Sequence, residues 1–353
     1  MTEGLPILHD RNARGFASDN YSGVHPEVLA AIARANGGHQ TAYGDDVYTA
    51  RLQEVFKGHF GDRVEAFPVF NGTGANIVAL QAVTQRWESV ICTASAHIHV
   101  DECAAPERMG GLKLMTVPTP DGKFTPSLID TVAIRQNDEH HAQTKVVSIT
   151  QTTELGTAYS VQEIAAIAEH VHTRGWVLHV DGSRLSNAAA TLGVSFKQMI
   201  TDTGVDILSF GGTKNGLMVG EAVVVLNPDV VQGMKYLRKQ SMQLASKMRF
   251  ISTQLEALLT NDLYLRNAAH SNAMARLLAE RVRDIDGLQI PRPVQANAVF
   301  AILPTAVSER LMEHFRFYFW DEATGEVRWM CAFDTTEDDV EAFAAAIRTE
   351  MTR

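Results

Sequence analysis

Short, nearly continuous apolar runs alternate along the chain with segments in which apolar residues recur at helical spacing. Such runs are typical of strands covered on both faces of a parallel sheet. Seven are expected to be strands: residues 65–70, 89–93, 112–117, 145–150, 176–180, 206–210 and 221–226. Residues 75–85 and 162–173, which lie between them, have helical patterns. The alternation predicts an open, mostly parallel α/β sheet.

The pattern changes after about residue 226. Residues 229–283 are rich in Gln, Leu, Met, Arg and Ala and are predicted to form a long helix. A smaller α+β unit follows, with strands expected near residues 288–290, 298–303, 315–319 and 327–330. Its terminal helix should begin with a capping box of Thr336 and Asp339. We therefore predict a large α/β domain over residues 1–250 and a small C-terminal α+β domain over residues 251–353.

Composition narrows the class of protein. The chain has 353 residues, 45% hydrophobic and 20% charged, as in ordinary folded proteins. Its apolar runs are far shorter than the roughly 20 residues that span a bilayer, and its first residues lack the apolar core of a secretory signal. With 41 acidic and 31 basic residues, the net charge of −10 disfavours a nucleic-acid partner. Cys92, Cys103 and Cys331 form no CxxC pair, which suits a reducing cytoplasm without structural zinc. We expect a cytoplasmic globular enzyme with no membrane partner.

Two motifs at expected strand ends suggest a ligand site. Residues 71–76, NGTGAN, follow a strand and open a helix, where glycines allow close approach and free N–H groups point at an anion. A plain strand-to-helix turn is the alternative. Residues 179–184, HVDGSR, place Asp181 at the carboxyl end of a strand, where such sheets bind ligands. Asp181 could hold a cationic ring nitrogen, or form an ordinary ion pair with Arg184.

A third motif ends the next strand. Residues 209–216, SFGGTKNG, place Lys214 in a loop flanked by glycines. A partly buried lysine has a lowered pKa and becomes a nucleophilic amine that can form a Schiff base. The alternative is a solvated surface lysine. No ligand cluster has the spacing of a metal site.

Together these motifs resemble the fold type I enzymes that use pyridoxal 5′-phosphate (PLP). Within that group the chain resembles the threonine aldolase family of the β-eliminating-lyase superfamily. The resemblance runs from about residue 16 to residue 348, and the segments that carry it occur in family order: residues 18–20, 43–48, 71–76, 96–97 with Glu102, 181–184 and 211–214. It implies a fold type I large domain with a mainly parallel seven-stranded sheet, to which residues 1–45 add site and interface contacts, and a small C-terminal domain.

The resemblance assigns the cofactor contacts residue by residue. Lys214 would carry PLP as a Schiff base, and Asp181 would pair with the pyridinium nitrogen, which keeps the ring an electron acceptor. The phosphate would be held by Gly72, Thr73 and Gly74.

Further contacts implied by the family complete the site. His97 would stack on the ring, Arg184 would contact the ring hydroxyl, and Arg249 of a neighbouring subunit would reach the phosphate. For the substrate carboxylate the candidates are Ser18, Arg184 and Arg328, since a guanidinium fits a carboxylate bidentately.

The implied assembly shares its sites between subunits. Tyr48 resembles a tyrosine that reaches the site across a subunit interface, with a buried structural aromatic as the alternative. A homo-oligomer, expected as a dimer of dimers, follows from the resemblance.

One segment departs from the family pattern. Many members have a histidine in a Thr-His-Asn-Gly segment near the substrate hydroxyl, whereas this chain has Thr-Thr-Glu-Leu-Gly at residues 152–156. Glu154 stands in that place, and glutamate can also accept a proton. The base for the hydroxyl proton is therefore either Glu154 or His97.

The activity implied is retro-aldol cleavage of L-threonine, L-allo-threonine or a related L-β-hydroxy-α-amino acid such as phenylserine into glycine and an aldehyde. Another PLP reaction, such as β-elimination, transamination or racemisation, is the first alternative, because the same scaffold serves all of them. A catalytically idle binding scaffold is the second, although both Lys214 and Asp181 are present.

Overall fold

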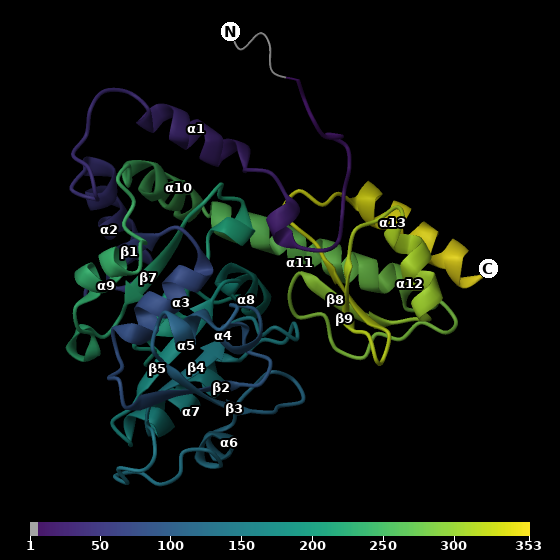
Figure 1. Cartoon of the computed structure of the whole chain (residues 1–353). Coiled ribbons are helices and arrows are strands. Elements are labelled where there is room, and N and C mark those ends of the chain that lie inside the picture. The colour runs from purple at the N-terminus through teal and green to yellow at the C-terminus, as the bar shows by residue number, and fades with distance from the viewer. Residues whose placement is uncertain (1–5) are drawn as a thin grey trace.

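A computed structural model describes residues 6–353, and its largest element is a seven-stranded sheet (Figure 1). The strand order is β1-β7-β6-β5-β4-β2-β3. The strands are β1 (Glu65–Val69), β2 (Glu88–Thr93), β3 (Lys113–Val117), β4 (Gln143–Thr150), β5 (Val177–Gly182), β6 (Ile207–Phe210) and β7 (Glu221–Val225). Each overlaps a strand predicted from the sequence, so the α/β class is confirmed. The first five residues of the predicted N-terminal segment lie outside the described residues.

Strand direction brings the loops of the sheet to one edge. Strands β3, β2, β4, β5 and β6 run parallel to one another, and β7 runs antiparallel to both β6 and β1. The carboxyl ends of six strands and the amino end of β7 therefore meet at the same edge. This is the edge at which open α/β sheets bind ligands.

Helices cover both faces of this sheet (Figure 1). Helix α7 begins with a capping box of Ser160 and Glu163 and buries Ile164, Ile167, Ala168 and Val171, as the sequence pattern predicts. The helices of this part are α1 (Pro26–Ala35), α2 (Val47–Phe60), α3 (Gly72–Gln81), α4 (His97–Val100), α5 (Ala105–Arg108), α6 (Pro126–Asp130), α7 (Val161–His172) and α8 (Leu185–Leu192). Single turns are η1 (Asp19–Tyr21), η2 (Lys197–Thr201), η3 (Thr213–Asn215) and η4 (Pro228–Val230).

Residues 229–283 contain three helices, so the prediction of one long helix is wrong. They are α9 (Met234–Gln240), α10 (Arg249–Leu259) and α11 (Leu263–Val282). Between α10 and α11, Asn261 and Asp262 have left-handed backbone conformations with φ of 51° and 54°. Short polar side chains tolerate that conformation because they can bond locally, so helix-favouring neighbours do not continue the helix through them.

The C-terminal part is a three-stranded antiparallel sheet with helices on it. Its strand order is β8-β10-β9, with β8 (Ala298–Ile302), β9 (Tyr318–Asp321) and β10 (Glu326–Met330). Helices α12 (Thr305–Met312) and α13 (Glu337–Met351) complete it, and α13 has the predicted capping box of Thr336 and Asp339.

One strand prediction in this part is wrong, and a second strand begins later than predicted. The segment near 288–290 makes only an isolated bridge from Gln289 to Ile302, because Pro291 and Pro293 supply no N–H for a longer ladder. The strand expected at 315–319 begins at Tyr318, since the N–H of Phe315 is still bonded to Leu311 at the end of α12.

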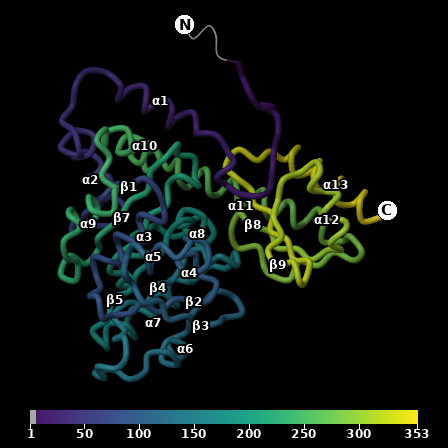
Figure 2. The backbone as a smooth tube through the Cα atoms, in the orientation of Figure 1, coloured from purple at the N-terminus to yellow at the C-terminus, as the bar shows by residue number. Residues whose placement is uncertain are grey.

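Two hydrophobic cores are joined by helix α11. Leu263 and Tyr264 of α11 pack into the core of the seven-stranded sheet, whereas Met274 and the residues after it pack into the second core. Phe16, from the N-terminal segment, stacks on Phe343 in this second core with ring centroids 4.4 Å apart. The N-terminal segment thus runs along the C-terminal part before it enters α1 (Figure 2). No helix within residues 6–353 has the length and apolar character needed to cross a membrane.

Replacing Trp329 with alanine should lower the free energy of unfolding by about 3–5 kcal/mol, because it empties a large site in the second core. Trp329 is fully buried and lies edge-on to Phe343 at 5.3 Å. Urea unfolding of the two proteins measures the difference. The control is Trp87→Ala, at a site 64% exposed, where a change within about 0.5 kcal/mol is expected. Equal effects of the two substitutions would contradict this account of the core.

Candidate active site

A cavity of about 380 Å³ opens at the sheet edge where the carboxyl ends of the strands meet. It brings together residues from the loops after β1, β2, β5 and β6 and from the start of β7. Its lining includes Asn20, Asn71, Gly72, Thr73, His97, Asp181, Ser183, Thr213, Lys214 and Glu221.

The N-terminus of α3 forms one wall of this cavity. Asn71 caps the helix, and its side-chain oxygen accepts the N–H of Gly74 at 2.8 Å. This cap explains why α3 begins at Gly72, three residues before the predicted start. The first N–H groups of a helix have no partner within it, so Gly72 and Thr73 offer theirs at the cavity wall, where an anion is favoured.

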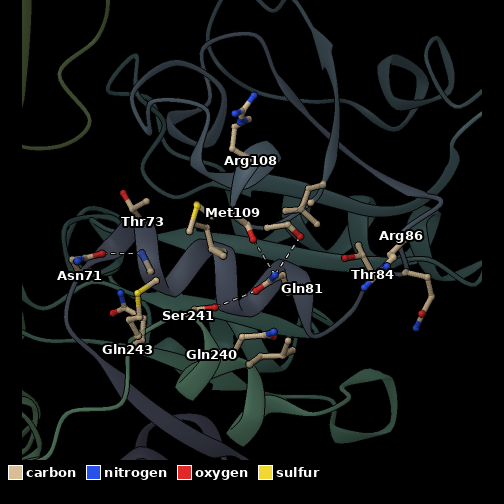
Figure 3. Close-up of a pocket in the computed structure, with 18 residues that line it drawn as sticks. Asn71, Thr73, Gln81, Thr84, Arg86, Arg108, Met109, Gln240, Ser241 and Gln243 are labelled. Atoms are coloured by element: carbon tan, nitrogen blue, oxygen red, sulfur yellow. Dashed lines mark hydrogen bonds between the residues drawn. The ribbon is translucent and has the colours of Figure 1, made fainter.

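A larger cavity, of about 980 Å³, lies behind the same turn of α3 (Figure 3). It shares Asn71 and Thr73 with the first cavity but is not lined by Asp181 or Lys214. Gly74 faces it, and a Cβ there would lie 2.2 Å from the side chain of Gln243. The reactive side chains Asp181 and Lys214 therefore line the smaller of the two cavities.

Asp181, at the end of β5, is a buried carboxylate held by specific donors. Oδ2 accepts a hydrogen bond from Asn76 Nδ2 at 2.9 Å, and Oδ1 accepts one from the N–H of Ser183 at 3.0 Å. Burial acts to raise the pKa of Asp181, but the charge of His97 and the bond from Asn76 outweigh it and keep the pKa below its ordinary value. Asp181 is therefore ionised at neutral pH.

His97, in the first turn of α4, faces Asp181 across the cavity. Its Nδ1 lies 2.9 Å from Oε1 of the buried Glu102. An ionised carboxylate only accepts, so Nδ1 carries the proton. The bond to Glu102 raises the pKa of His97, against the opposing effect of burial. Asn76 links the two carboxylates, because Nδ2 also donates to Glu102 at 2.8 Å.

Lys214 lies in the turn after β6 and is half-buried. Burial lowers the pKa of Lys214, and the positive charge of Arg184 lowers it further. A lysine in such a site loses its proton more readily and is a better nucleophile.

Arg184 is held by a residue from the N-terminal segment. Its Nε and Nη2 donate to the two oxygens of Asp19, at 2.8 and 3.0 Å. Asn297, just before β8, also donates to Asp19 at 3.1 Å. Arg184 does not line the cavity, and its bidentate partner is Asp19.

Arg328, on β10, lies near this ion pair. Its guanidinium is 5.2 Å from the ring of Trp320, and its Nη2 is 3.4 Å from the carbonyl oxygen of Ala17. Nε is buried without a hydrogen-bond partner. Burial, and then the charge of Arg184, lower the pKa of Arg328 to about 10. A half-buried cation with a buried, unused donor is suited to binding an anion.

Glu154 lies behind His97 and outside the cavity lining. Its Oε1 accepts the backbone N–H of His97 and the hydroxyl of Thr150, both at 2.8 Å. Burial raises the pKa of Glu154, and Oε2 is buried without a partner. The carboxyl group thus holds the backbone of His97 in place.

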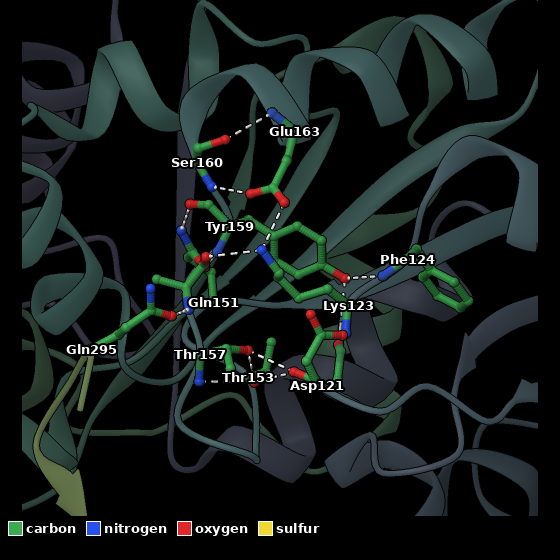
Figure 4. A network of polar contacts seen from close by, with 12 residues as sticks. Asp121, Lys123, Phe124, Gln151, Thr153, Thr157, Tyr159, Ser160, Glu163 and Gln295 are labelled. Atoms are coloured by element: carbon green, nitrogen blue, oxygen red, sulfur yellow. Dashed lines mark hydrogen bonds and ion pairs between the residues drawn. The ribbon is translucent and has the colours of Figure 1, made fainter. Parts of the chain in front are cut away.

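A polar network fixes the loop that carries Glu154 (Figure 4). The side chain of Gln151 bonds both the N–H and the carbonyl of Tyr159, each at 2.9 Å, which closes residues 151–159 into a compact loop. The Tyr159 hydroxyl accepts the N–H of Phe124 at 2.7 Å. Gln295, which precedes β8, accepts the N–H of Ala158 at 2.9 Å. The loop is therefore anchored to both parts of the molecule.

Like Arg184 and Glu154, Arg328 and three further residues assigned from the sequence do not line this cavity. Ser18 caps η1 by accepting the N–H of Asn20 at 3.2 Å. Tyr48 is half-buried in the first turn of α2. Arg249 begins α10, and its Nη1 donates to the carbonyl of Gly38 at 3.1 Å.

Sequence reasoning gave no role to Asn76, Asp19 or Glu221. Asn76 stands only at the end of the motif at residues 71–76, and Asp19 only in the family-like segment 18–20. The order of strands, which places Glu221 beside Lys214, is not visible in a pattern of apolar residues. Among residues 6–353, no three His, Cys, Asp or Glu side chains are arranged to hold a metal ion.

Comparisons with known proteins match this architecture. The beta-eliminating lyase family model matches residues 15–306. The low specificity L-threonine aldolase of Pseudomonas aeruginosa is 46% identical, over 95% of this chain and 97% of that protein. The solved structure of Leishmania major threonine aldolase has a TM-score of 0.89 at 29% identity and covers 95% of this chain and 99% of that one. Oryza sativa TDC, solved with PLP and tryptamine, shares the fold with a TM-score of 0.75 at 14% identity, over 96% of this chain and 83% of that one.

Replacing Glu102 with glutamine should lower the pKa of His97, because the substitution removes the carboxylate that stabilises the charged ring. NMR titration of the cofactor-free protein, with the His97 signal assigned from a His97→Asn variant, measures it. The pair of His97 and Glu102 stabilises the fold fully at a pH below the pKa of histidine in the unfolded chain, about 6.5. This stabilisation is lost as the pH rises through the higher pKa of His97 in the folded protein. Glu107→Gln, on exposed α5, is the control. A His97 pKa that stays the same in Glu102→Gln would contradict the role of the hydrogen bond.

Proposed function

We propose a reaction and a cofactor for this chain, which belongs to the beta-eliminating lyase family and to the threonine aldolases within it. The reaction is cleavage of L-threonine, L-allo-threonine or a related L-β-hydroxy-α-amino acid into glycine and an aldehyde. The cofactor is PLP. One observation carries the proposal. Lys214, the ionised Asp181 and the N-terminus of α3 line a single cavity. An amine nucleophile, a carboxylate for a cationic ring and an anion site are the three contacts that PLP requires.

The residues present fit PLP in charge and in space. Gly72 has open space where a Cβ would be, so the phosphate can approach the N–H groups of Gly72 and Thr73. The N–H of Gly74, also assigned from the sequence, is already bonded to Asn71. Asp181 would hold the ring nitrogen, Lys214 would bind the aldehyde carbon, and Arg184 would lie near the ring hydroxyl. PLP, when bound, would supply the electron sink for the charge left at Cα as the Cα–Cβ bond breaks.

The substrate carboxylate is proposed to bind Arg328. Its buried Nε has no partner within the described chain, whereas Arg184 already has both its Nε and Nη2 bonded to Asp19. Ser18 lies beside Ala17, whose carbonyl contacts Arg328, and would complete the carboxylate site. The small domain thereby holds the substrate against the cavity of the large domain.

His97 is proposed to accept the proton of the β-hydroxyl. It lines the cavity, whereas Glu154 does not, and the proton on Nδ1 is directed to Glu102. In the neutral ring the other nitrogen, Nε2, therefore carries no proton and is free to accept one on the substrate side. Glu154 would act through His97, since its Oε1 holds the His97 backbone.

A homo-oligomer is proposed, expected as a dimer of dimers. Tyr48 and Arg249 do not line the cavity of their own chain, which supports their contribution to the site of a neighbouring subunit. Met109 and Met242, which line the larger cavity behind α3, are 62% and 69% exposed. Large apolar side chains exposed at one cavity are typical of surfaces that bind another protein.

The proposed compartment is the cytoplasm. The three cysteines are free, and Cys92 and Cys331 are buried, as expected of a protein that folds under reducing conditions.

Lys214→Ala should abolish both the yellow colour of the PLP-loaded enzyme and the release of aldehyde and glycine from L-threonine, because no other amine lines the cavity in the described chain. Absorbance scans and product assays measure the two effects. Lys235→Ala, on exposed α9, should leave both unchanged. Release of a keto acid and ammonia by the wild-type enzyme would keep PLP and reject the aldolase reaction. A variant lacking Lys214 that keeps colour and turnover would reject the lysine assignment.

His97→Phe should lower kcat by about 10²- to 10⁴-fold, the usual range for loss of a general base, while it retains a flat ring. Glu154→Gln should reduce kcat much less, because a glutamine oxygen can still accept the N–H of His97. Steady-state kinetics with L-threonine and L-phenylserine measure both variants. A larger loss in Glu154→Gln than in His97→Phe would reverse the two roles.

A further inference from the structure

Glu221 is a buried carboxyl group in the cavity that the proposed reaction does not use. It is 7% exposed and lines the cavity together with Lys214. Its position follows from topology, because β7 is the one antiparallel strand of the sheet and begins at the edge where the others end. Its register partner on β1 is Val69, the last residue of that strand.

The contacts of Glu221 lead directly to Lys214. Oε2 accepts the N–H of Gly212 at 2.5 Å, and Oε1 accepts the N–H of Thr213 at 3.4 Å. These are the two residues before the lysine, and the turn η3 that contains it has no cap of its own. The first N–H groups of such a turn need an outside acceptor, and Glu221 provides it.

The loop has little freedom to choose another position. A Cβ at Gly211 would lie 2.4 Å from the carbonyl oxygen of Ser183, and one at Gly212 would lie 2.6 Å from that of Gly220. Gly220 directly precedes Glu221, so the loop and the start of β7 are packed backbone to backbone. A small movement of the carboxylate would therefore move the turn that carries Lys214.

We propose that Glu221 is a positioning residue for Lys214: its carboxylate holds the two N–H groups before the lysine and supplies a negative charge that keeps a proton on the lysine nitrogen. The inference rests on the proposed function, in which that nitrogen binds the cofactor. It goes beyond it in naming a carboxylate that holds the turn before the lysine and acts on the charge of the nitrogen.

The charges around the pair fix the direction of the effect. The charged group that faces Glu221 is Lys214, after β6. Lys214 in turn faces Arg184, which precedes α8, Asp19 in η1 and Asp181 on β5. Arg184 favours loss of the proton from Lys214, and the three carboxylates oppose it. Burial raises the pKa of Glu221 to about 7, so this carboxyl group changes its charge near neutral pH.

Glu221→Gln tests the proposal, because the side chain keeps its shape and one acceptor oxygen but loses its charge. The matched control is Glu65→Gln. Glu65 begins β1 at the opposite end of the same strand pair, where it is exposed and opposite Val225. Both substitutions remove one acidic charge from the β1–β7 ladder, but only one does so beside the lysine.

The first measurement is the pH dependence of the visible absorbance of the PLP-loaded enzyme. Removing a negative charge beside a protonated nitrogen makes it lose its proton more readily, so the midpoint should fall by about one pH unit in Glu221→Gln. Glu65→Gln should keep the wild-type midpoint. A side chain with only a structural role would change thermal stability and leave the midpoint in place. An unchanged midpoint in Glu221→Gln would overturn the proposal.

The second measurement needs no cofactor. Cyanate reacts with unprotonated amines, and peptide mass spectrometry gives the rate at Lys214 as a function of pH. In cofactor-free Glu221→Gln the rate should rise at lower pH than in the wild type, and the same pH dependence in both would overturn the proposal even if the variant binds no PLP. A wild-type protein that takes up no PLP would reject the proposed function, while this measurement would still decide the role of Glu221.

Discussion

The buried carboxylate of Asp181 is the constraint on which the site depends. Removing an ion from water costs several kcal/mol unless partners replace the water. The N–H of Ser183, just after β5, supplies one partner, and the rest of the compensation comes chiefly from Asn76 on α3 and from the charge of His97. Asn76 then needs a position in the first turns of α3, which is the helix whose N-terminus faces the same cavity. The hydrogen bond that Asp181 needs from Asn76 thereby fixes the position of the α3 N-terminus relative to the Asp181 carboxylate.

The second layer of charge ties the parts of the chain together. Asp19 comes from the N-terminal segment, Arg184 from the loop after β5, and Asn297 from just before β8. Arg184 and Asn297 each donate hydrogen bonds to the Asp19 carboxylate, all at 3.1 Å or less. Arg328 lies beside this group and carries an unused buried donor. Because Asp19 and Asn297 are buried, separating the C-terminal part from the sheet would leave Asp19 without the hydrogen bond from Asn297. This cluster of Asp19, Arg184, Asn297 and Arg328 thus forms where the N-terminal segment, the seven-stranded sheet and the C-terminal part pack together.

Sequence patterns predicted what depends on local order. The seven apolar runs became the seven strands, and the glycine-rich turns and acidic strand end led directly to Gly72, Asp181 and Lys214. What they missed depends on elements far apart in the chain: Asp19 meets Arg184 across 165 residues, and Asn76 meets Asp181 across 105. The break between α10 and α11 was also missed, since two left-handed residues end a helix that its neighbours favour. Apolar periodicity carries no information about such partners.

The antiparallel direction of β7 places Glu221 on a strand, and not on a loop, next to the turn that carries Lys214. Each parallel strand ends at this edge and continues into a loop. The side chains at that end can therefore move with the loop. Strand β7 brings its first residue, which pairs with β1 while the next residue pairs with β6. A carboxylate at that point is held on a rigid element and can fix a neighbouring turn more precisely than a loop residue can. The turn that carries Lys214 is therefore held by the sheet itself, through the bonds of Glu221 to Gly212 and Thr213.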